Sequence, residues 1–177
     1  MTGLPAWHEE PIDKGHHRKD FDCGNSALNL YLQAHARQSH ESGASKTYVA
    51  VADGDSHGIL GYYTLSPAQV DFERVPELAR HKLGRHDVGG FRLGRLAVTT
   101  SLQGQSMGGQ LLVAAARRCM RASEQVGGTA LMIDAKDEKA ADWYKLFGAV
   151  ALLDRPLSLL MPYALLQDAL AKAGRSL

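Results

Sequence analysis

A glycine-rich stretch in the second half of the sequence has the residue types that bind phosphate groups. It follows an apolar segment that ends in Leu96, Ala97 and Val98, and its residues are Gln103, Gly104, Gln105, Ser106, Met107, Gly108 and Gly109. In a strand–loop–helix arrangement, the unpaired N–H groups of the first helical turn and the positive end of the helix dipole point at one spot. Such a spot suits a pyrophosphate. The alternative interpretation is a strand-to-helix turn in which the glycines only allow the backbone to bend and no ligand binds.

The stretch differs from two common nucleotide-binding loops. A P-loop carries Gly-Lys-Ser/Thr after its first glycine, and no such sequence follows here. A dinucleotide-binding Rossmann loop has three glycines at a fixed spacing, which this stretch also lacks. The pattern therefore favours neither a nucleotide triphosphatase nor a nicotinamide-dependent enzyme.

The sequence before the loop predicts strands and one clear helix. Asn25 is a typical N-cap, and four of the residues that follow it fall on one helical face: Leu28, Tyr31, Leu32 and His35. Strands are expected where β-branched and aromatic residues gather between turn residues. The expected elements are an edge strand near the start, a helix over 26–39, a turn over 41–45, strands over 46–52 and 58–65, a short helix over 76–83 and a strand over 91–98.

The sequence after the loop predicts alternating helices and strands. An amphipathic helix begins near Ser106, with its apolar face formed by Met107, Leu111, Leu112, Ala115, Ala116 and Cys119. The further elements are a buried strand over 129–133, a helix over 137–147 with Gly148 as its C′ residue, short apolar runs over 149–153 and 157–161, and a last helix after Pro162. The order β-α-β-β-(α)-β-α-β-α-β-α predicts an α+β fold with one mixed sheet flanked by helices.

Composition limits the class of protein. The chain has 177 residues and a formal net charge of +1, which predicts one domain and excludes both a highly basic tail and a disordered acidic chain. Two cysteines form no disulfide framework, and the histidines lack metal-ligand spacing, so we expect no metal and solvated histidines. No signal-peptide core and no run of eighteen apolar residues occurs, and a cytoplasmic location is the default expectation.

Two blocks of the sequence resemble the GNAT acetyltransferases. Residues 95–112 resemble motif A of that family, in which a strand ending Leu-Ala-Val precedes Gln/Arg-x-x-Gly-x-Gly/Ala. Ser106 stands where the first glycine is usual, and its N–H can still face a phosphate if its φ is negative. A second family pattern appears in altered form as Asp137, Ala140, Tyr144 and Gly148. Asp137 replaces the usual Asn, and Ala149 the usual Phe.

A narrower resemblance covers nearly the whole chain. The segments beginning at Phe21, Lys46, Gly61, Leu93 and Trp143 are similar to the GNAT toxins of bacterial toxin–antitoxin pairs. The resemblance implies a GNAT fold over residues 1–177, with a central mixed, mostly antiparallel β-sheet flanked by α-helices. It also implies acetyl transfer from acetyl-CoA to the amino group of aminoacyl-tRNA, a ribbon-helix-helix antitoxin and a homodimer.

The resemblance assigns roles to individual residues. Acetyl-CoA would bind residues 96–98, residues 103–109 and Asp137, and the strand at 96–98 would splay from its neighbour so that its backbone pairs with pantetheine. Tyr144 would be the general acid, because a phenol pKa near 10 is close to that of an alkyl thiol. For Tyr144 alone, a packing aromatic on a helix is the alternative.

Basic residues gather locally despite the near-neutral net charge. Within 73–95 they outnumber acidic residues and comprise Arg74, Arg80, Lys82, Arg85, Arg92 and Arg95. Further groups are Arg117, Arg118 and Arg121, and the segment Lys14–Lys19. They predict either a surface that follows the phosphates of tRNA or ordinary solvated faces.

Two other functions remain open from the sequence. The first is a GNAT acetyltransferase of a small-molecule amine, which an acidic acceptor pocket would favour. The second is a non-catalytic CoA-binding or RNA-binding module, against which the presence of Tyr144 argues.

Overall fold

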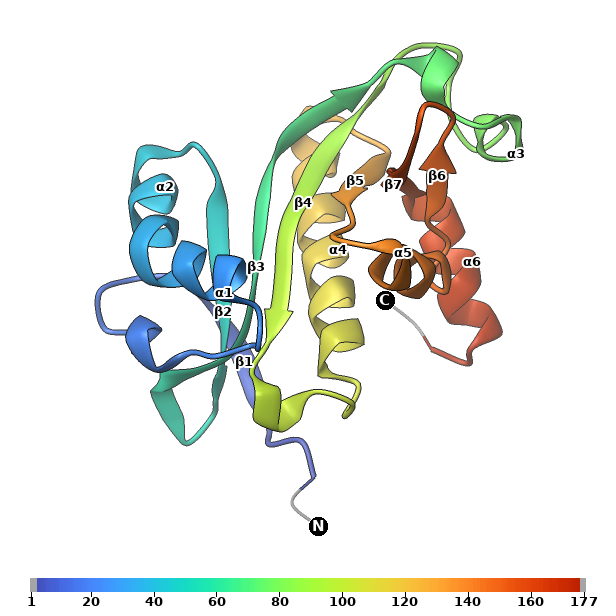
Figure 1. The fold of residues 1–177 in the computed structure, drawn as a ribbon. Coiled ribbons are helices and arrows are strands. Elements are labelled where there is room, and N and C mark those ends of the chain that lie inside the picture. Colours follow the sequence, from blue (N-terminus) through green and yellow to red (C-terminus); the bar gives the residue numbers. More distant parts are fainter. Residues whose placement is uncertain (1–2, 176–177) are drawn as a thin grey trace. The chain divides into compact units, whose positions relative to one another are not determined.

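The computed structural model describes residues 3–175 (Figure 1). The chain divides into two units. Unit 1 comprises the residues up to Ser66 together with Gly94–Ala115. Unit 2 comprises Pro67–Leu93 and the residues from Ala116 onward. Within residues 3–175, no helix has the length and apolar character that crossing a lipid bilayer requires.

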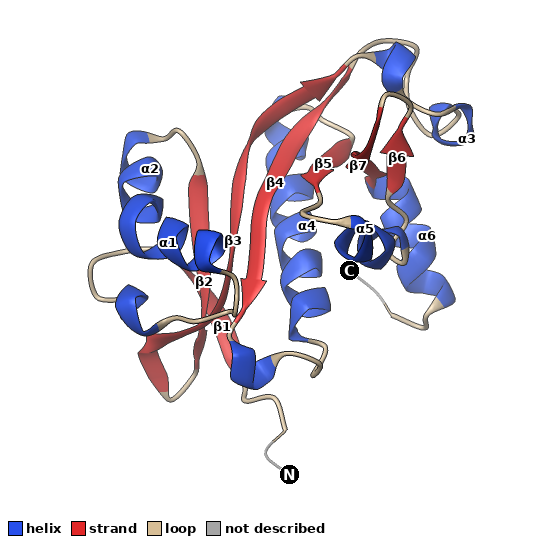
Figure 2. Ribbon diagram, in the orientation of Figure 1, coloured by secondary structure: helices blue, strands red, loops and turns tan. Residues whose placement is uncertain are grey.

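Helices and strands alternate along most of the chain (Figure 2). The strands are β1 (Trp7–Pro11), β2 (Lys46–Ala52), β3 (Asp55–Val70), β4 (Val88–Val98), β5 (Ala130–Asp134), β6 (Val150–Leu152) and β7 (Arg155–Pro162). The helices are α1 (Ser26–Leu30), α2 (Ala36–Ser42), α3 (Glu77–Arg80), α4 (Met107–Val126), α5 (Glu138–Lys145) and α6 (Tyr163–Lys172). Shorter helical turns are η1 (Arg18–Asp20), η2 (Tyr31–His35), η3 (Phe72–Arg74) and η4 (Thr100–Leu102).

The strands pair in the order β1-β2-β3-β4-β5-β7-β6. The β4–β5 pair is parallel, whereas β1–β2, β2–β3, β5–β7 and β6–β7 are antiparallel. The predicted α+β class with a mixed, mostly antiparallel sheet is confirmed. The two apolar runs near the C-terminus are two separate strands, β6 and β7, where the predicted element order allowed for one.

Unit 1 has a helical layer on one face of its strands. Asn25 caps α1 as predicted, because its side chain accepts a hydrogen bond of 3.0 Å from Leu28 N. The expected helix over 26–39 instead contains the π-turn η2 and continues to Ser42, so part of the predicted 41–45 turn is helical. Burial explains the π-turn: its wider i→i+5 spacing lets Tyr31, Leu32 and Ala36 all enter the core.

The two central strands are longer than the sequence predicts. β3 extends past the expected 58–65 at both ends, and β4 starts three residues before the expected 91–98. In β3 the segment Ser66–Val70 alternates between half-buried and exposed positions and ends in the buried Val70, which joins the core of unit 2. The exposed positions carry Pro67 and Gln69, and a proline within such a run argues against a strand, so the sequence does not reveal this part of β3.

Unit 2 is centred on β5. Residues 90–93 of β4 pair with 130–133 of β5, and β7 pairs on the opposite edge of β5. The buried core beside these strands consists of Val70, Val75, Ala79, Val88, Ala130, Met132, Leu152 and Leu160. After α5, Gly148 takes a left-handed φ of 96°, in agreement with its predicted place beyond the end of that helix.

Gly90 is needed where β4 meets β5. A Cβ atom at Gly90 would lie 2.0 Å from the carbonyl oxygen of Ala130, whereas a Cβ at Gly89 would meet nothing within 4 Å. We expect Gly90→Ala to lower the free energy of unfolding by about 3 kcal/mol, because the backbone must move apart. Gly89→Ala is the matched control and should change stability by less than about 1 kcal/mol. Urea denaturation of both variants tests this, and equal midpoints would contradict it.

Candidate functional site

The glycine-rich loop lies at the end of β4 in unit 1. After Val98 the chain forms the turn η4, then a turn over 103–106, and enters α4 at Met107. The side-chain amide of Gln103 donates hydrogen bonds to Val98 O at 2.9 Å and to Cys23 O at 2.8 Å. Gln103 therefore fastens the loop to the strand end and to the segment before α1, a structural role in addition to the predicted contact with cofactor.

Two loop residues have left-handed backbone conformations. Gly104 has φ 76°, and Ser106, with φ 68°, is the one non-glycine residue among the described residues with positive φ. The condition under which the Ser106 N–H could still face a phosphate, a negative φ, is therefore not met. The turn into α4 requires this conformation, which costs an L-residue about 1–2 kcal/mol and explains why glycine is usual here.

The first turn of α4 presents free backbone donors. The amide of Gln110 bonds to Ser106 O at 3.2 Å, so the amides of residues 107–109 precede the first helical acceptor. Met107 is buried and anchors the turn, whereas Gly108 and Gly109 are half-buried and have no side chains to cover their amides. The first turn carries no acidic residue. These features fit the pyrophosphate of acetyl-CoA.

Strand β4 is paired with its parallel neighbour over only part of its length. The β4–β5 ladder runs from Gly90–Ala130 to Leu93–Ile133, while β4 itself continues to Val98. On its other edge β4 lies beside β3, where Gly61 faces Ala97 O and Gly94 faces Thr64. Residues 96–98 therefore have no strand partner, among the described residues, on the edge of β4 that faces β5 at residues 90–93. The predicted splay requires such an unpaired edge.

Tyr144 lies on α5 in unit 2. It is 8% exposed and makes an edge-to-face contact with Trp143 at 4.9 Å between ring centres. Burial raises the pKa of Tyr144 to about 12. The expected match between a phenol pKa near 10 and a thiol is therefore wrong, and Tyr144 is a weaker acid. Its hydroxyl has no hydrogen-bond partner among the described residues and stays protonated, so it can act as a neutral donor.

Asp137 has a structural role at the start of α5. Its carboxylate accepts a hydrogen bond of 2.7 Å from Ala140 N, which makes it the N-cap of the helix. Asp and Asn are about equally good N-caps, so the departure from the usual Asn preserves this function. Asp137 is exposed, and its predicted contact with cofactor remains a prediction.

Most of the predicted tRNA-contacting residues in unit 2 have partners inside that unit. Arg74 Nε lies 3.0 Å from Asp154, Lys82 Nζ lies 3.7 Å from Asp168, and Arg92 forms a close ion pair with Asp134. The Arg80 side chain donates 2.8 Å and 3.2 Å hydrogen bonds to the carbonyl oxygens of Val75 and Glu73 and lies over the Phe72 ring. Aspartates therefore partly neutralise the charges of Arg74, Lys82 and Arg92. The guanidinium of Arg80 is occupied by backbone carbonyls and the Phe72 ring.

The remaining basic residues differ in their surroundings. Arg85 is exposed in a pocket that is also lined by Asp71, Glu73 and Asp87. Arg117 and Arg121 are exposed on α4, one helical turn apart, and Arg118 is half-buried. Arg95 belongs to unit 1, where its guanidinium stacks on Tyr31. Sequence reasoning missed this role of Tyr31, which shows in the sequence only as an apolar helix position.

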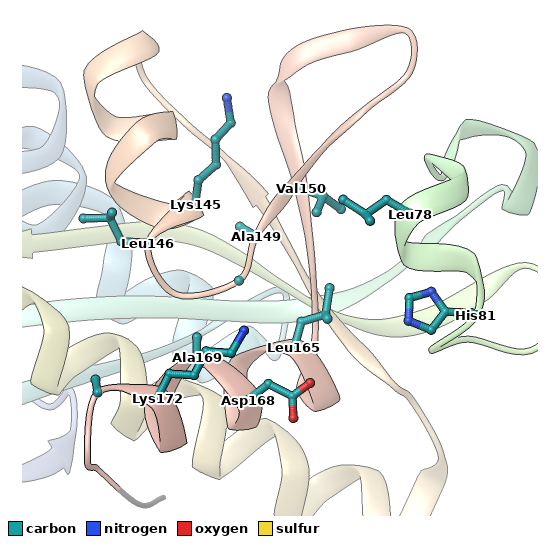
Figure 3. Close-up of a pocket in the computed structure, with 12 residues that line it drawn as sticks. Leu78, His81, Lys145, Leu146, Ala149, Val150, Leu165, Asp168, Ala169 and Lys172 are labelled. Atoms are coloured by element: carbon teal, nitrogen blue, oxygen red, sulfur yellow. The ribbon is translucent and has the colours of Figure 1, made fainter.

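A separate pocket of about 640 Å³ lies within unit 2, between α3, the end of α5, β6 and α6 (Figure 3). Leu78, Leu146, Val150 and Leu165 give it an apolar character, and its charged residues are Lys145, Asp168 and Lys172. None of the residues predicted to bind cofactor or tRNA lines it.

One histidine corrects the expectation of solvated histidines. His16 is 5% exposed; its Nδ1 accepts a 3.0 Å hydrogen bond from Asp13 N, and its Nε2 donates to Glu10 at 2.9 Å. Within the described part of the chain, no three His, Cys, Asp or Glu side chains form a metal-binding group.

Among known proteins, the chain is similar to toxins of one kind. No protein-family model matches the chain. A tRNA-acetylating toxin of Mycobacterium tuberculosis is 30% identical over 154 residues, which cover 87% of this chain and 89% of that protein.

Two solved structures add ligands to this comparison. AtaT in complex with acetyl-methionyl-tRNAfMet is 30% identical with a TM-score of 0.82, and the match covers 89% of this chain and 95% of AtaT. A variant of AtaT bound to acetyl-CoA and to the C-terminus of the antitoxin AtaR is 29% identical with a TM-score of 0.78, over 91% of this chain and 96% of the other.

The left-handed backbone at Ser106 gives a test of the loop. We expect Ser106→Gly to raise the free energy of unfolding by about 0.5–1 kcal/mol, because relief of strain exceeds the greater chain entropy of glycine. Ser101→Gly is the matched control: Ser101 lies in the same loop without positive φ, and glycine there should destabilise the protein. Thermal and urea unfolding measure both. A loss of stability in Ser106→Gly would contradict the conformation described here.

Proposed function

The chain belongs to the GNAT-type tRNA-acetylating toxins of toxin–antitoxin systems, and from this premise we propose that it transfers acetyl from acetyl-CoA to the α-amino group of aminoacyl-tRNA. The observation that carries the proposal is the loop at the start of α4. Gly104 and Ser106 turn the chain so that the amides of 107–109 are free, in a helical turn without an acidic residue.

In unit 1, the backbone N–H groups of residues 107–109 would hold the pyrophosphate of acetyl-CoA, and the turn over 103–106 would present them. Leu96, Ala97 and Val98 would pair through the unpaired edge of β4 with the amide-bearing arm of the same molecule. A backbone N–H of this segment that donates to the acetyl carbonyl oxygen would polarise it, and such fixed donors are often a large contribution to catalysis. Acetyl-CoA supplies the activated acetyl thioester.

In unit 2, Tyr144 would stabilise the sulfur that loses the acetyl group. Because burial raises the pKa of Tyr144 to about 12, the phenol keeps its proton throughout the physiological range. Its contribution is then a hydrogen bond to the negative charge that develops on sulfur, and the proton that completes the thiol is the one that the attacking amine loses. A residue titrating near neutral pH is not needed for this role.

The acceptor amine needs no dedicated base. The α-amino group of a peptide has a pKa near 7.7–8.0, so an appreciable fraction is neutral at physiological pH. A lysine side chain, with a pKa near 10.4, has a neutral fraction roughly several hundredfold smaller under the same conditions. With an aminoacyl-tRNA acceptor, the protein therefore does not need to supply a general base for the amine.

The partners follow from the same premise. AtaT has been solved with acetyl-methionyl-tRNAfMet and with the C-terminus of the antitoxin AtaR, and we propose that this chain binds aminoacyl-tRNA and a ribbon-helix-helix antitoxin. We also propose that residues 1–177 act as a single GNAT domain, that the protein is a homodimer, and that it works in the cytoplasm. Induced expression should stop growth, and a small adjacent open reading frame should restore it.

Tyr144→Phe tests the proposed donor. The variant keeps the ring and removes one hydroxyl, so turnover should fall by roughly 10²–10⁴-fold with acetyl-CoA affinity unchanged. Tyr163→Phe is the control, because Tyr163 is also a tyrosine of unit 2 with a raised pKa and its hydroxyl lies 3.2 Å from Ser123 Oγ. It should keep near wild-type turnover. Full activity in Tyr144→Phe would overturn the assignment.

The pH profile of the rate gives a second test of the role proposed for Tyr144. Because a phenol donates a hydrogen bond only in its protonated form and the pKa of Tyr144 is raised to about 12, the rate should rise as the amine deprotonates and then stay level to about pH 10. Short initial-rate assays with charged tRNA between pH 6.5 and pH 10 measure this. A fall in rate that begins near pH 8 or pH 9 would assign the proton to another group.

The acceptor is tested with charged tRNA, uncharged tRNA and a panel of small amines, using labelled acetyl-CoA. Charged tRNA should be acetylated and uncharged tRNA should be inert, because it lacks the α-amine. Each phosphate contact should lower log affinity by about 0.7–0.9 per log unit of salt, a dependence much weaker for a small amine. If small amines are modified and charged tRNA is not, the protein is an ordinary small-molecule acetyltransferase.

A further inference from the structure

Arg95 differs from the other basic residues predicted to contact tRNA. Its guanidinium carbon lies 3.5 Å from the centre of the Tyr31 ring. Among the described residues, no carboxylate or carbonyl oxygen forms an ion pair or hydrogen bond with it. Arg74 and Arg92, by contrast, are each paired with an aspartate. Arg95 therefore keeps its full charge and all its N–H donors for a ligand.

The ring beneath Arg95 is fixed in place. Tyr31 is 9% exposed, and its hydroxyl lies 3.0 Å from Ser45 Oγ. A guanidinium stacked on an aromatic face keeps its five N–H donors in one plane, and that planar fork matches the oxygens of a phosphate. Stacking thus limits the motion of the side chain before any ligand arrives, which reduces the entropy lost on binding.

The strand places Arg95 on one particular face of unit 1. Side chains two apart on a strand share a face, so Arg95 points the same way as Ala97, which packs in one cluster with Tyr31 and Leu32. The other face carries α4, because a Cβ at Gly61 would lie 2.7 Å from Leu111 Cδ1. Arg95 is thus on the α1–α2 face and is separated by the strands from the face covered by α4.

Sequence position links Arg95 to acyl transfer. It directly precedes Leu96, the first residue of the segment proposed to pair with acetyl-CoA. An aminoacyl ester is attached to the ribose of the terminal adenosine of tRNA, and the phosphate of that nucleotide lies on the other side of the same sugar. A group that holds this phosphate next to residues 96–98 would bring the α-amine to the strand.

We propose that Arg95, stacked on Tyr31, binds the phosphate of the terminal nucleotide of the acceptor tRNA and so positions the aminoacyl group. The inference rests on the proposed function, since it names the part of that substrate that Arg95 recognises. The ligand chemistry is a phosphate monoester or diester. The competing source, a phosphate of acetyl-CoA, is expected at the start of α4, and the experiment separates the two.

The test uses stable amide analogues of the aminoacylated terminal adenosine, one with and one without a 5′-phosphate. They are measured as competitive inhibitors against charged tRNA at saturating acetyl-CoA, which keeps them from the cofactor site. In the wild-type protein the 5′-phosphate should strengthen inhibition by roughly 10- to 100-fold, as expected for hydrogen bonds between charged groups. In Arg95→Gln this gain should fall below about twofold. Arg95→Lys should keep only part of the gain, because lysine retains the positive charge but lacks the planar fork of N–H donors.

The control variants separate recognition from folding. Arg37→Gln removes one positive charge from the same unit, at a residue paired with Glu41 on α2, and should leave the phosphate effect unchanged. Tyr31→Phe keeps the ring and should behave as wild type, whereas Tyr31→Leu removes the platform and should lose part of the effect. Acetyl-CoA affinity, measured by calorimetry, should be the same in all five variants.

The outcomes are distinct. A phosphate effect that is absent in wild type, or that survives in Arg95→Gln, overturns the inference. A loss of acetyl-CoA affinity in Arg95→Gln equal to its loss of the phosphate effect also overturns it, because the phosphate would then belong to the cofactor. If the wild-type protein acetylates no charged tRNA, the proposed function fails and this inference fails with it. If charged tRNA is acetylated and only the phosphate effect is missing, the proposed function stands.

Discussion

The site depends on one constraint in the sheet: β4 pairs with β5 only at residues 90–93. On the same edge, residues 96–98 have no strand partner among the described residues. Backbone N–H and C=O groups that lose water must find partners, so a half-buried strand with a free edge favours a ligand that can complete the ladder. At the paired end the fit is close enough that only glycine is accommodated at position 90. At the other end, residues 96–98 lie beyond the β4–β5 ladder, and this is where we propose that the amide-bearing arm of acetyl-CoA pairs. A uniformly paired β4 would have no such capacity.

The loop that follows β4 is held more rigidly than its glycines suggest. Gln103 joins it to Val98 and to Cys23, and Met107 is buried at the start of α4. Between these two anchors the chain must reverse in few residues, and the left-handed conformations of Gly104 and Ser106 accomplish this. Strain at Ser106 is thus maintained by the surrounding contacts, as is common at ligand-binding turns. Nothing in the structure explains why this residue is serine in place of glycine.

The sequence predicted the parts of the fold whose signals are local. Asn25 as a cap, Gly148 beyond α5 and the strand over 46–52 each depend on a residue type or a short period, and all three are confirmed. The extension of β3 to Val70 was missed because Pro67 argues against a strand, and these residues are strand only through their neighbours. The π-turn over 31–35 was missed for a related reason, since packing decides it.

The features of the site that the sequence did not predict are those set by distant neighbours. The pKa of Tyr144 depends on burial, which its own residue type does not reveal. The sign of φ at Ser106 depends on the geometry of the whole turn. For the basic residues, a count of charges in 73–95 overlooks that Arg74, Lys82 and Arg92 find carboxylates at Asp154, Asp168 and Asp134. Those acids lie far away in sequence.

Neutralisation of these charges changes how a polyanion can be recognised. A protein with a net charge of +1 gains little from its overall field, so non-specific attraction to nucleic acid is weak at physiological salt. Exposed ion pairs also contribute little to affinity, because each must be broken or shared before it contacts a phosphate. Recognition then depends on a few cations that are both unpaired and held in place. Arg95 meets both conditions, since its charge is unpaired among the described residues and its plane is fixed by Tyr31. If Arg95 binds the terminal phosphate as proposed, geometry at this one position adds discrimination for the acceptor end of tRNA to whatever the other phosphate contacts contribute.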